Sequence, residues 1–179
     1  MKKILAFAGS NSPTSINHQL VLHVSEKIME HEVNLIKLTD FNIPMYSIVL
    51  EKEGIPEDVK NLYKMILDHD ALIISVNEYN HNVSGFFKNI LDWLSREDRK
   101  FLQEKKILLM STSPGKRGGA SAFEYAEHIF TFFGGEIIES FKFPEFYEYF
   151  NSEENKFSDE IQELGLMDVL TNFAQQIKD

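Results

Sequence analysis

Two kinds of segment alternate along the chain. Short, nearly uninterrupted apolar runs are typical of strands that are buried on both faces, and longer stretches place apolar residues at the spacing of a helix face. The apolar runs predict strands at Lys3–Ala8, Val33–Leu38, Ala71–Val76, Ile107–Met110 and Glu136–Ser140. The helical spacing predicts helices at about Ile16–Met29, Pro56–Asp70, Ser84–Arg96, 120–133 and Ser158–Ile177. The aromatic and acidic stretch Phe141–Lys156 is expected to be irregular. Core packing is the default for the aromatic residues of 146–150, with an interface or the wall of a pocket as the alternatives.

This alternation of strands and helices determines the expected fold class. It predicts an α/β protein with a parallel sheet between two layers of helices. Five strands fit the flavodoxin-like three-layer sandwich, in which the strand order is 2-1-3-4-5. No repeat, linker or shift in composition divides the 179 residues, so we expect 1–179 to form a single domain.

Three of the predicted strands end in unusually polar loops, at residues 9–17, 77–84 and 111–119. In the order 2-1-3-4-5 these three strands are neighbours. Ligands of such sheets bind beyond the carboxyl ends of the strands. The sequence therefore predicts that the three loops converge on one ligand site.

The first loop runs from Gly9 to Asn17 and joins a strand to the start of a helix. Free backbone N–H groups and the positive end of the helix dipole suit such a loop to a phosphate. Taken alone, the pattern also fits a serine-rich helix cap. The second loop offers one aromatic residue, Tyr79, among amide groups that can bind the edge of a planar heterocycle. The glycines of the third loop allow the backbone to lie close to a flat ring.

A phosphate site beside a site for a flat, polar-edged ring indicates a mononucleotide-like cofactor. The chain has neither Gly-x-Gly-x-x-Gly after its first strand nor Gly-x-x-x-x-Gly-Lys-Ser/Thr, which argues against a dinucleotide fingerprint and a P-loop.

Composition excludes several other kinds of site and partner. The net charge of −10 argues against a nucleic-acid partner. With no cysteine and no metal-binding spacing among the six histidines, we predict no metal site and no thiolate nucleophile. The apolar run that follows Met1 is too short for a signal peptide or a membrane span, so we expect a cytoplasmic protein that makes no membrane contact.

The motifs in the three loops resemble those of one family. That family usually has Gly-Ser-x-Arg-x-x-Ser-x-Asn in its first loop, where this chain has Gly9-Ser10-Asn11-Ser12-Pro13-Thr14-Ser15-Ile16-Asn17. Its second loop usually reads Pro-Glu-Tyr-Asn, followed by Gly, Leu-Lys-Asn and Asp-Trp. Here Asn77-Glu78-Tyr79-Asn80 precedes Gly85, Lys88-Asn89 and Asp92-Trp93 at the same spacing. Its third loop has Ser-Pro-Gly and further glycines, which correspond to Ser113-Pro114-Gly115 and Gly118-Gly119. Over residues 1 to about 140, the chain thus resembles the NAD(P)H-dependent FMN reductase family, a flavodoxin-like group of quinone, azo-dye and chromate reductases.

The resemblance implies FMN as the cofactor, with its phosphate on Ser10, Ser12, Ser15, Ile16 and Asn17. It implies that the edge of the isoalloxazine ring lies on Asn77, Glu78, Tyr79 and Asn80, with Ser113 and Gly115 behind the ring. It also implies a homodimer or homotetramer, in which the helix that carries Trp93 helps to form the interface.

Three positions depart from the family pattern. Ser12 replaces the usual arginine, so the phosphate would rest on dipoles alone and FMN retention is expected to be weaker. Asn77 replaces proline, which removes a rigid residue from the second loop. Lys116 replaces a common glycine, and we expect its side chain to be solvated.

The resemblance implies an oxidoreductase that takes hydride from NADPH or NADH and reduces a quinone, flavin or similar small acceptor. A ping-pong mechanism is expected because both substrates would use the same flavin face. Because the flavin carries this chemistry, we predict no catalytic side chain, and we expect Glu78 to serve as a structural hydrogen-bond partner or a backbone contact. Two alternatives stay open: an electron carrier or partner-binding protein without its own NAD(P)H turnover, which the acidic charge favours, and a family member that has lost FMN.

Overall fold

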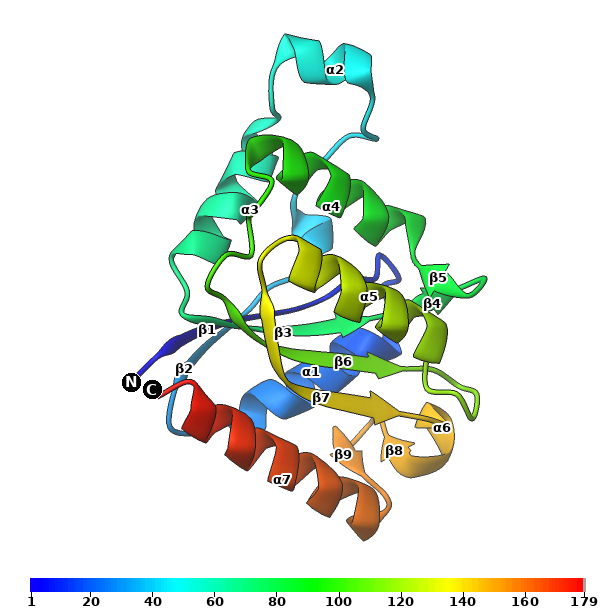
Figure 1. Ribbon diagram of the computed structural model, residues 1–179. Coiled ribbons are helices and arrows are strands. Elements are labelled where there is room, and N and C mark those ends of the chain that lie inside the picture. Colours follow the sequence, from blue (N-terminus) through cyan, green and yellow to red (C-terminus); the bar gives the residue numbers. More distant parts are fainter. Residues whose placement is uncertain (179) are drawn as a thin grey trace.

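A five-stranded parallel sheet forms the centre of the molecule (Figure 1). The computed structural model describes residues 1–178. The strands are β1 (Lys3–Ala8), β2 (Glu32–Leu35), β3 (Ala71–Val76), β6 (Lys106–Thr112) and β7 (Glu136–Phe143). Their order across the sheet is β2-β1-β3-β6-β7. Counted among these five strands alone, this is the predicted order 2-1-3-4-5, so the predicted topology is confirmed.

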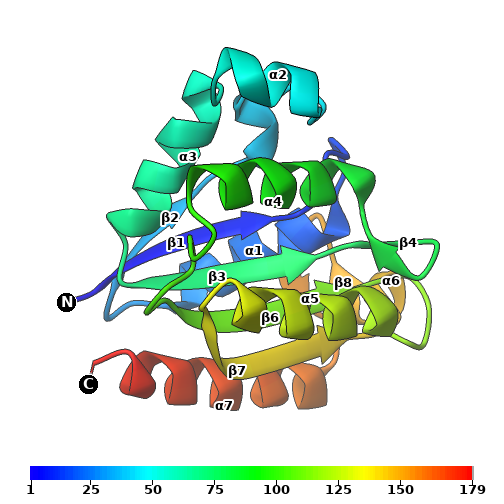
Figure 2. The same cartoon turned by 45° about the horizontal axis from the view of Figure 1, so that its top comes forward.

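Helices cover both faces of the sheet (Figure 2). One layer contains α3 (Glu57–Leu67), α4 (Gly85–Glu97) and α5 (Ala120–Phe132), and the other contains α1 (Ile16–Lys27) and α7 (Glu160–Gln176). The side chains of β1 alternate between the two layers. Leu5 and Phe7 pack with the first, and Ile4 and Ala6 pack with the second. Both faces of β1 are buried, which explains why its sequence is apolar throughout.

The strand boundaries differ from the prediction where a strand lies at the edge of the sheet or continues into polar residues. The edge strand β2 pairs only with β1 and ends at Leu35, three residues before the predicted end. By contrast, β6 continues through Ser111 and Thr112, both buried, and β7 continues to Phe143. Hydrogen bonding with a neighbouring strand extends these two strands beyond the part that hydrophobicity marks.

Several short elements were not predicted from the apolar pattern. They are the 3₁₀ helix η1 (Leu38–Asp40), the helices α2 (Ile48–Glu53) and α6 (Phe146–Tyr149), and the hairpins β4 (Glu78–Tyr79) with β5 (Asn82–Val83) and β8 (Phe150–Asn151) with β9 (Lys156–Phe157). Each has six residues or fewer, which is too short for a periodic pattern to be recognised. The region 141–156 is therefore more regular than the sequence predicted.

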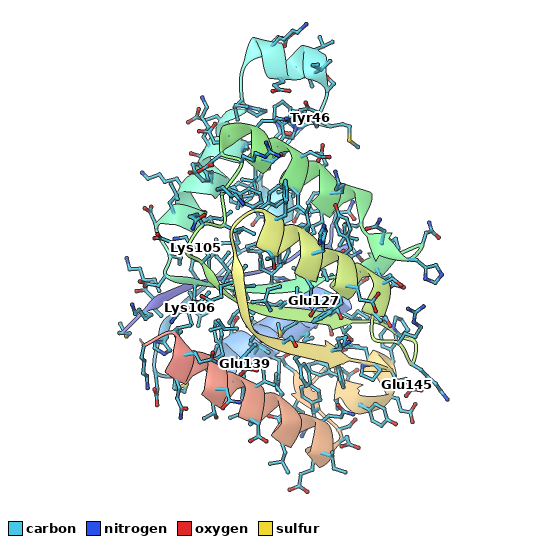
Figure 3. The ribbon with its side chains drawn as sticks, in the orientation of Figure 1. Tyr46, Lys105, Lys106, Glu127, Glu139 and Glu145 are labelled. Atoms are coloured by element: carbon cyan, nitrogen blue, oxygen red, sulfur yellow. The ribbon has the colours of Figure 1, made fainter. Side chains whose placement is uncertain are left out.

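Helix α2 projects from the body of the molecule (Figure 1) and buries none of its residues. The segment before it is attached to α4. The carbonyl oxygen of Pro44 accepts hydrogen bonds from Trp93 Nε1 at 2.8 Å and from Asn89 Nδ2 at 3.0 Å. Tyr46, labelled in Figure 3, packs edge-to-face on the ring of Trp93. Trp93 is thus fully buried within this chain, so its side chain does not face a second subunit, and a role of α4 in an interface stays a prediction.

No helix within residues 1–178 is both long enough and apolar enough to cross a lipid bilayer.

Candidate functional site

The three polar loops meet at the carboxyl edge of the sheet and enclose a pocket of about 260 Å³. The first loop contributes Ser10, Ser12, Thr14, Ser15, Ile16 and Asn17. The second contributes Asn77, Glu78 and Tyr79, and the third contributes Thr112, Ser113 and Pro114. Tyr147 of α6 completes the lining. The predicted convergence of the loops is therefore observed.

Nine of the eleven residues predicted to bind a cofactor line this pocket. The two that do not are Asn80 and Gly115, both exposed beside it. Asn80 and His81 occupy the turn of the β4–β5 hairpin with φ of 51° and 63°, as a two-residue hairpin turn requires. A cofactor contact by Asn80 or Gly115 stays a prediction.

Gly9 allows the first loop to begin close to the core. Its N–H donates to the carbonyl oxygen of Ser75 at 2.9 Å, and its own carbonyl oxygen accepts from Ser84 Oγ at 2.8 Å. A Cβ atom at this position would lie 2.7 Å from Cγ of the buried Phe87 ring. Glycine is therefore required here by close packing.

The hydroxyl groups of the first loop hydrogen-bond mainly within the loop. Ser10 Oγ accepts from the N–H of Ser12 at 3.2 Å, and Ser12 Oγ accepts from that of Thr14 at 3.3 Å. Ser15 caps helix α1 by accepting from the N–H of His18. The N–H groups of Ile16 and Asn17 precede the first hydrogen bond within the helix, and both residues line the pocket. This arrangement suits an anion at the positive end of α1.

The side chain of Asn17, at the start of α1, is hydrogen-bonded to the ends of strands β3 and β6. Its Oδ1 accepts from Ser75 Oγ at 2.7 Å and from the N–H of Thr112 at 3.1 Å, and its Nδ2 donates to the carbonyl oxygen of Thr112 at 3.1 Å. These three bonds occupy both polar atoms of the amide, which thereby holds the first and third loops together. The sequence predicted Asn17 at the site but not this bridging role.

Charge at the pocket is sparse. Among the lining residues, all of which the structure describes, Glu78 alone carries a formal charge at neutral pH. A hollow of about 340 Å³ behind the first loop shares Ser10 and Ser12 with the pocket and contains His18 together with one cation, Lys37, and one carboxylate, Asp40. Burial lowers the pKa of His18, Lys37 lowers it further, and Asp40 opposes the shift. An anion in the pocket would thus be held by backbone dipoles, as expected from the serine at position 12.

Glu78 ties the second loop to the helix that follows the third. Its Oε2 accepts from the N–H groups of Ser121 at 2.8 Å and Ala122 at 3.1 Å. These groups lie at the start of α5, whose own N-cap, Gly119, offers no side-chain acceptor. A carboxylate is favourable there because it pairs with free N–H groups and with the helix dipole. Glu78 is therefore a helix cap supplied by another loop.

Asn77 differs from every other polar side chain of the pocket. It is 6% exposed, and neither Nδ2 nor Oδ1 has a hydrogen-bond partner among the described residues. Burying an amide without partners is unfavourable. A ligand rich in donors and acceptors would relieve this deficit, so the site fits a polar cofactor such as FMN.

Tyr147 reaches the pocket because α6 is anchored to the third loop. The N–H of Glu145 donates to the carbonyl oxygen of Gly115 at 3.1 Å, and that of Phe146 donates to the carbonyl oxygen of Ser113 at 3.1 Å. Phe146 is fully buried, whereas Tyr147 is 68% exposed. Glu145, labelled at this edge in Figure 3, adopts a left-handed conformation with φ of 50°. The default prediction of core packing is confirmed for Phe146 and Phe150, and Tyr147 takes the alternative position in the wall of the pocket.

Within residues 1–178, no three His, Cys, Asp or Glu side chains are grouped so that they could hold a metal ion.

Comparison with known proteins connects this geometry to one family. The family described as NADPH-dependent FMN reductase matches residues 2–147. A quinone reductase of Escherichia coli is 35% identical over 106 residues, which cover 59% of this chain and only 55% of that enzyme. An uncharacterized protein of Mycoplasma pneumoniae is 33% identical over 132 residues, covering 70% of this chain and 76% of that protein.

Solved structures show the same fold. A flavoenzyme NAD(P)H:(acceptor) oxidoreductase from Paracoccus denitrificans superimposes with a TM-score of 0.81 at 25% identity, covering 99% of this chain and 98% of the other. A flavodoxin from Bacillus cereus superimposes with a TM-score of 0.61 at 14% identity, covering 98% of both chains, which shows likeness of fold alone.

Proposed function

This chain belongs to the NADPH-dependent FMN reductase family, and from that membership we propose that it is an FMN-dependent oxidoreductase. In this proposal 1–179 form a single domain that binds FMN in the pocket at the carboxyl edge, takes hydride from NADPH or NADH, and reduces a quinone, flavin or similar small acceptor. The observation that carries the proposal is the convergence of the three family motifs on one pocket that contains nine of the eleven expected cofactor residues.

The residues of the pocket suit two parts of FMN, its phosphate and its ring. The phosphate is assigned to the first loop and the positive end of α1, where Ile16 and Asn17 present their N–H groups. The ring is assigned to the second and third loops, whose relative position the Glu78 cap maintains. When bound, FMN supplies the centre that accepts and donates hydride. The chain's own residues bind and orient it, and Tyr79 and Tyr147 flank the opening.

One opening serves both substrates in this proposal, so the nicotinamide and the acceptor would enter in turn. That arrangement is the basis of the proposed ping-pong mechanism. It requires no acid or base from the protein, in keeping with a lining in which Glu78 is engaged by two backbone N–H groups.

A second copy of the chain is part of the proposal. The projecting segment around α2 exposes the apolar side chains of Met45, Ile48 and Val49, and exposed apolar side chains grouped on one segment are typical of interaction surfaces. Light scattering should give the mass of a homodimer or homotetramer, and Ile48→Glu should reduce it. A monomeric wild-type protein would contradict this part. Location in the cytoplasm stays a prediction.

The test of the proposed activity uses the purified protein with FMN under anaerobic conditions. Adding NADPH or NADH should bleach the absorbance of the oxidised flavin, and a quinone should restore it. FMN without protein, treated in the same way, is the control. If neither nucleotide bleaches the flavin faster than in that control, the proposal is wrong.

An electron carrier without NAD(P)H turnover is the second candidate, and the net charge of −10 favours it because an acidic surface docks basic partners. Reductive titration distinguishes the two functions. A carrier should accumulate a one-electron semiquinone, whereas a hydride-transferring reductase should pass directly to the two-electron reduced form.

A further inference from the structure

Two buried asparagines line the same pocket and differ completely in their hydrogen bonding. Asn17 is 3% exposed and its amide makes three hydrogen bonds to Ser75 and Thr112. Asn77 is 6% exposed, and its amide makes none within the described part of the chain. Buried amides are nearly always paired, so an amide without partners calls for an explanation. Both amide atoms are enclosed in the ligand-free protein, but Asn77 lines the pocket, so turning its side chain toward a ligand there would supply the missing partners.

The position of Asn77 in the sheet identifies which part of a ligand it can reach. Asn77 directly follows β3, whose neighbours are β1 and β6. Ala8 is paired with Ser75, and Val76 is paired with Ser111. Continuing these registers places Asn77 between Ser10 of the first loop and Thr112 of the third. It therefore lies beside the loop assigned to the phosphate, and the exposed Tyr79 lies farther out along the second loop.

We propose that the side-chain amide of Asn77 binds the ribityl chain of FMN, with Nδ2 donating to one hydroxyl oxygen and Oδ1 accepting from a hydroxyl. This inference rests on the proposed function and refines it, since the family resemblance implied a contact with the ring edge. The ribityl chain joins the phosphate to the ring, so it must cross the region between the first loop and the outer part of the second. Each of its hydroxyls both donates and accepts, which matches an amide that lacks both kinds of partner.

This contact offsets the other departure from the family pattern. The usual proline at position 77 has no side-chain donor or acceptor, whereas the usual arginine at position 12 carries a charge. This chain has an amide in place of the proline and a serine in place of the arginine. Binding of FMN therefore depends less on contacts with the phosphate and more on contacts with the ribityl chain. The ribityl chain is uncharged, so these contacts depend little on ionic strength.

The test compares Asn77→Leu with Asn17→Leu, two substitutions of the same type in one pocket. Asn77→Leu should weaken FMN binding about tenfold, the effect expected from two neutral hydrogen bonds. The melting temperature of the FMN-free protein should stay the same or rise, because the substitution removes an unpaired polar group. Asn17→Leu should lower that melting temperature, because it breaks three hydrogen bonds.

FMN analogues locate the contact. Removing the ribityl hydroxyl that Asn77 binds, in 2′-, 3′- or 4′-deoxy-FMN, should weaken binding to the wild type and change binding to Asn77→Leu much less. Riboflavin, which lacks the phosphate but keeps the ribityl chain, should lose about the same factor as FMN on going from wild type to Asn77→Leu. The reduction potential of bound FMN should be unchanged by the substitution, because the contact does not involve the ring.

Three results would overturn the inference. The first is an unchanged FMN affinity in Asn77→Leu, and the second is an equal loss of affinity for the deoxy analogues in the wild type and in Asn77→Leu. The third is a shifted reduction potential of bound FMN, which would place the amide on the ring. A fall in the melting temperature like that of Asn17→Leu would show a structural role, and Asn77→Ala, which cannot overpack the site, must give the same answer. If the wild type itself binds no FMN, the proposed function fails and this inference fails with it, an outcome distinct from all the others.

Discussion

Two pockets lie at opposite edges of the sheet, and the larger and more highly charged one is not the candidate site. The pocket at the amino edge has a volume of about 440 Å³, against about 260 Å³ at the carboxyl edge. Its lining includes Lys2, Asp68, His69, Asp70, Glu104, Lys105 and Lys106. Figure 3 shows Lys105 and Lys106 on this side, opposite Glu145.

The charges of the amino edge are used by the fold. Lys105 Nζ donates to the carbonyl oxygens of Leu67 at 3.0 Å and His69 at 2.7 Å, where α3 ends, and Lys106 Nζ donates to the carbonyl oxygen of Gln176 at the end of α7. Asp70 accepts from the N–H of Lys3 at 2.8 Å. At the carboxyl edge the amide of Asn77 has no such partner. We therefore assign the candidate site by the family motifs and the unpaired amide of Asn77, and not by volume or charge.

The largest effect should come from Gly9, which begins the first loop of the carboxyl-edge pocket and packs against Phe87. Gly9→Ala places a Cβ atom 2.7 Å from the Phe87 ring, so the loop must shift. We expect a loss of about 1–3 kcal/mol in the free energy of unfolding and loss of measurable FMN binding. Chemical denaturation measures the free energy of unfolding, and fluorescence titration measures the binding of FMN. Gly85→Ala, where a Cβ would meet nothing within 4 Å, is the control. Tight FMN binding by Gly9→Ala would show that the first loop is not part of the site.

A pair of substitutions compares the two edges directly. Glu78→Ala leaves two N–H groups of α5 unpaired, and Lys105→Met leaves two carbonyl oxygens of α3 and its following turn unpaired. Glu78→Ala should lower the free energy of unfolding by about 1–3 kcal/mol, and Lys105→Met by about 1 kcal/mol or less, because its hydrogen bond to Leu67 is exposed and water can replace it. Only Glu78→Ala should also raise the dissociation constant for FMN, by about tenfold or more, because it separates two loops of the pocket. An equal rise in both would contradict the assignment of FMN to the carboxyl edge.

Restoring the family's arginine should add charge where the site lacks it. Ser12→Arg places a cation beside the loop assigned to the phosphate, and a charge-assisted hydrogen bond there should tighten FMN binding about tenfold. Riboflavin, which has no phosphate, should gain nothing. Titrations at low and high salt measure this, since the gain should shrink as salt screens the new charge. Tighter binding of riboflavin as well would show that the phosphate lies elsewhere.

Tyr147 should have a smaller effect, because it contacts the pocket from its exposed rim. Tyr147→Ala should weaken FMN binding about threefold to tenfold, the range expected for one aromatic contact. Tyr147→Phe should keep most of the affinity. Since Tyr147 is 68% exposed, neither substitution should change the melting temperature by more than about 1–2 °C. A large loss of stability would instead place Tyr147 in the core cluster of Phe146.

The smallest effect is predicted at the amino edge and depends on pH. The hydrogen bond from the N–H of Lys3 holds the pKa of Asp70 below its ordinary value; burial opposes this shift, and the charges of Lys2 and Lys105 add to it. A lowered pKa means that the folded protein prefers the ionised carboxylate. The resulting stability is present above the ordinary pKa and is lost as the pH falls through the lowered one.

Asp70→Asn should therefore lower the melting temperature near neutral pH, by less than about 4 °C because the group is partly exposed. The difference from wild type should vanish in acid, which melting curves between about pH 7 and about pH 3 measure. FMN affinity at neutral pH should not change. A difference that grows in acid would contradict the sign of the pKa shift.

The bounds of the central strands could be predicted almost to the residue, because a strand that is buried on both faces consists of consecutive apolar residues. β1 and β3 have the predicted bounds, and the loops after them and after β6 were expected to meet. Elements held by a few long-range bonds could not be predicted. α6 is placed by two hydrogen bonds to the third loop, and α2 by the attachment of Pro44 to Asn89 and Trp93. Neither arrangement produces a periodic pattern of apolar residues in the sequence.

By itself, then, the sequence determined the fold class, the strand order and the loops that make the site, since burial on two faces and the positions of polar residues at strand ends are local patterns. The tertiary structure alone decided what each polar side chain does there. Asn17 and Asn77 are the same residue in two loops of one pocket, yet one amide has three partners and the other has none. Those partners come from strands 58 and 95 positions away in the chain, and only the folded sheet brings them within hydrogen-bonding distance.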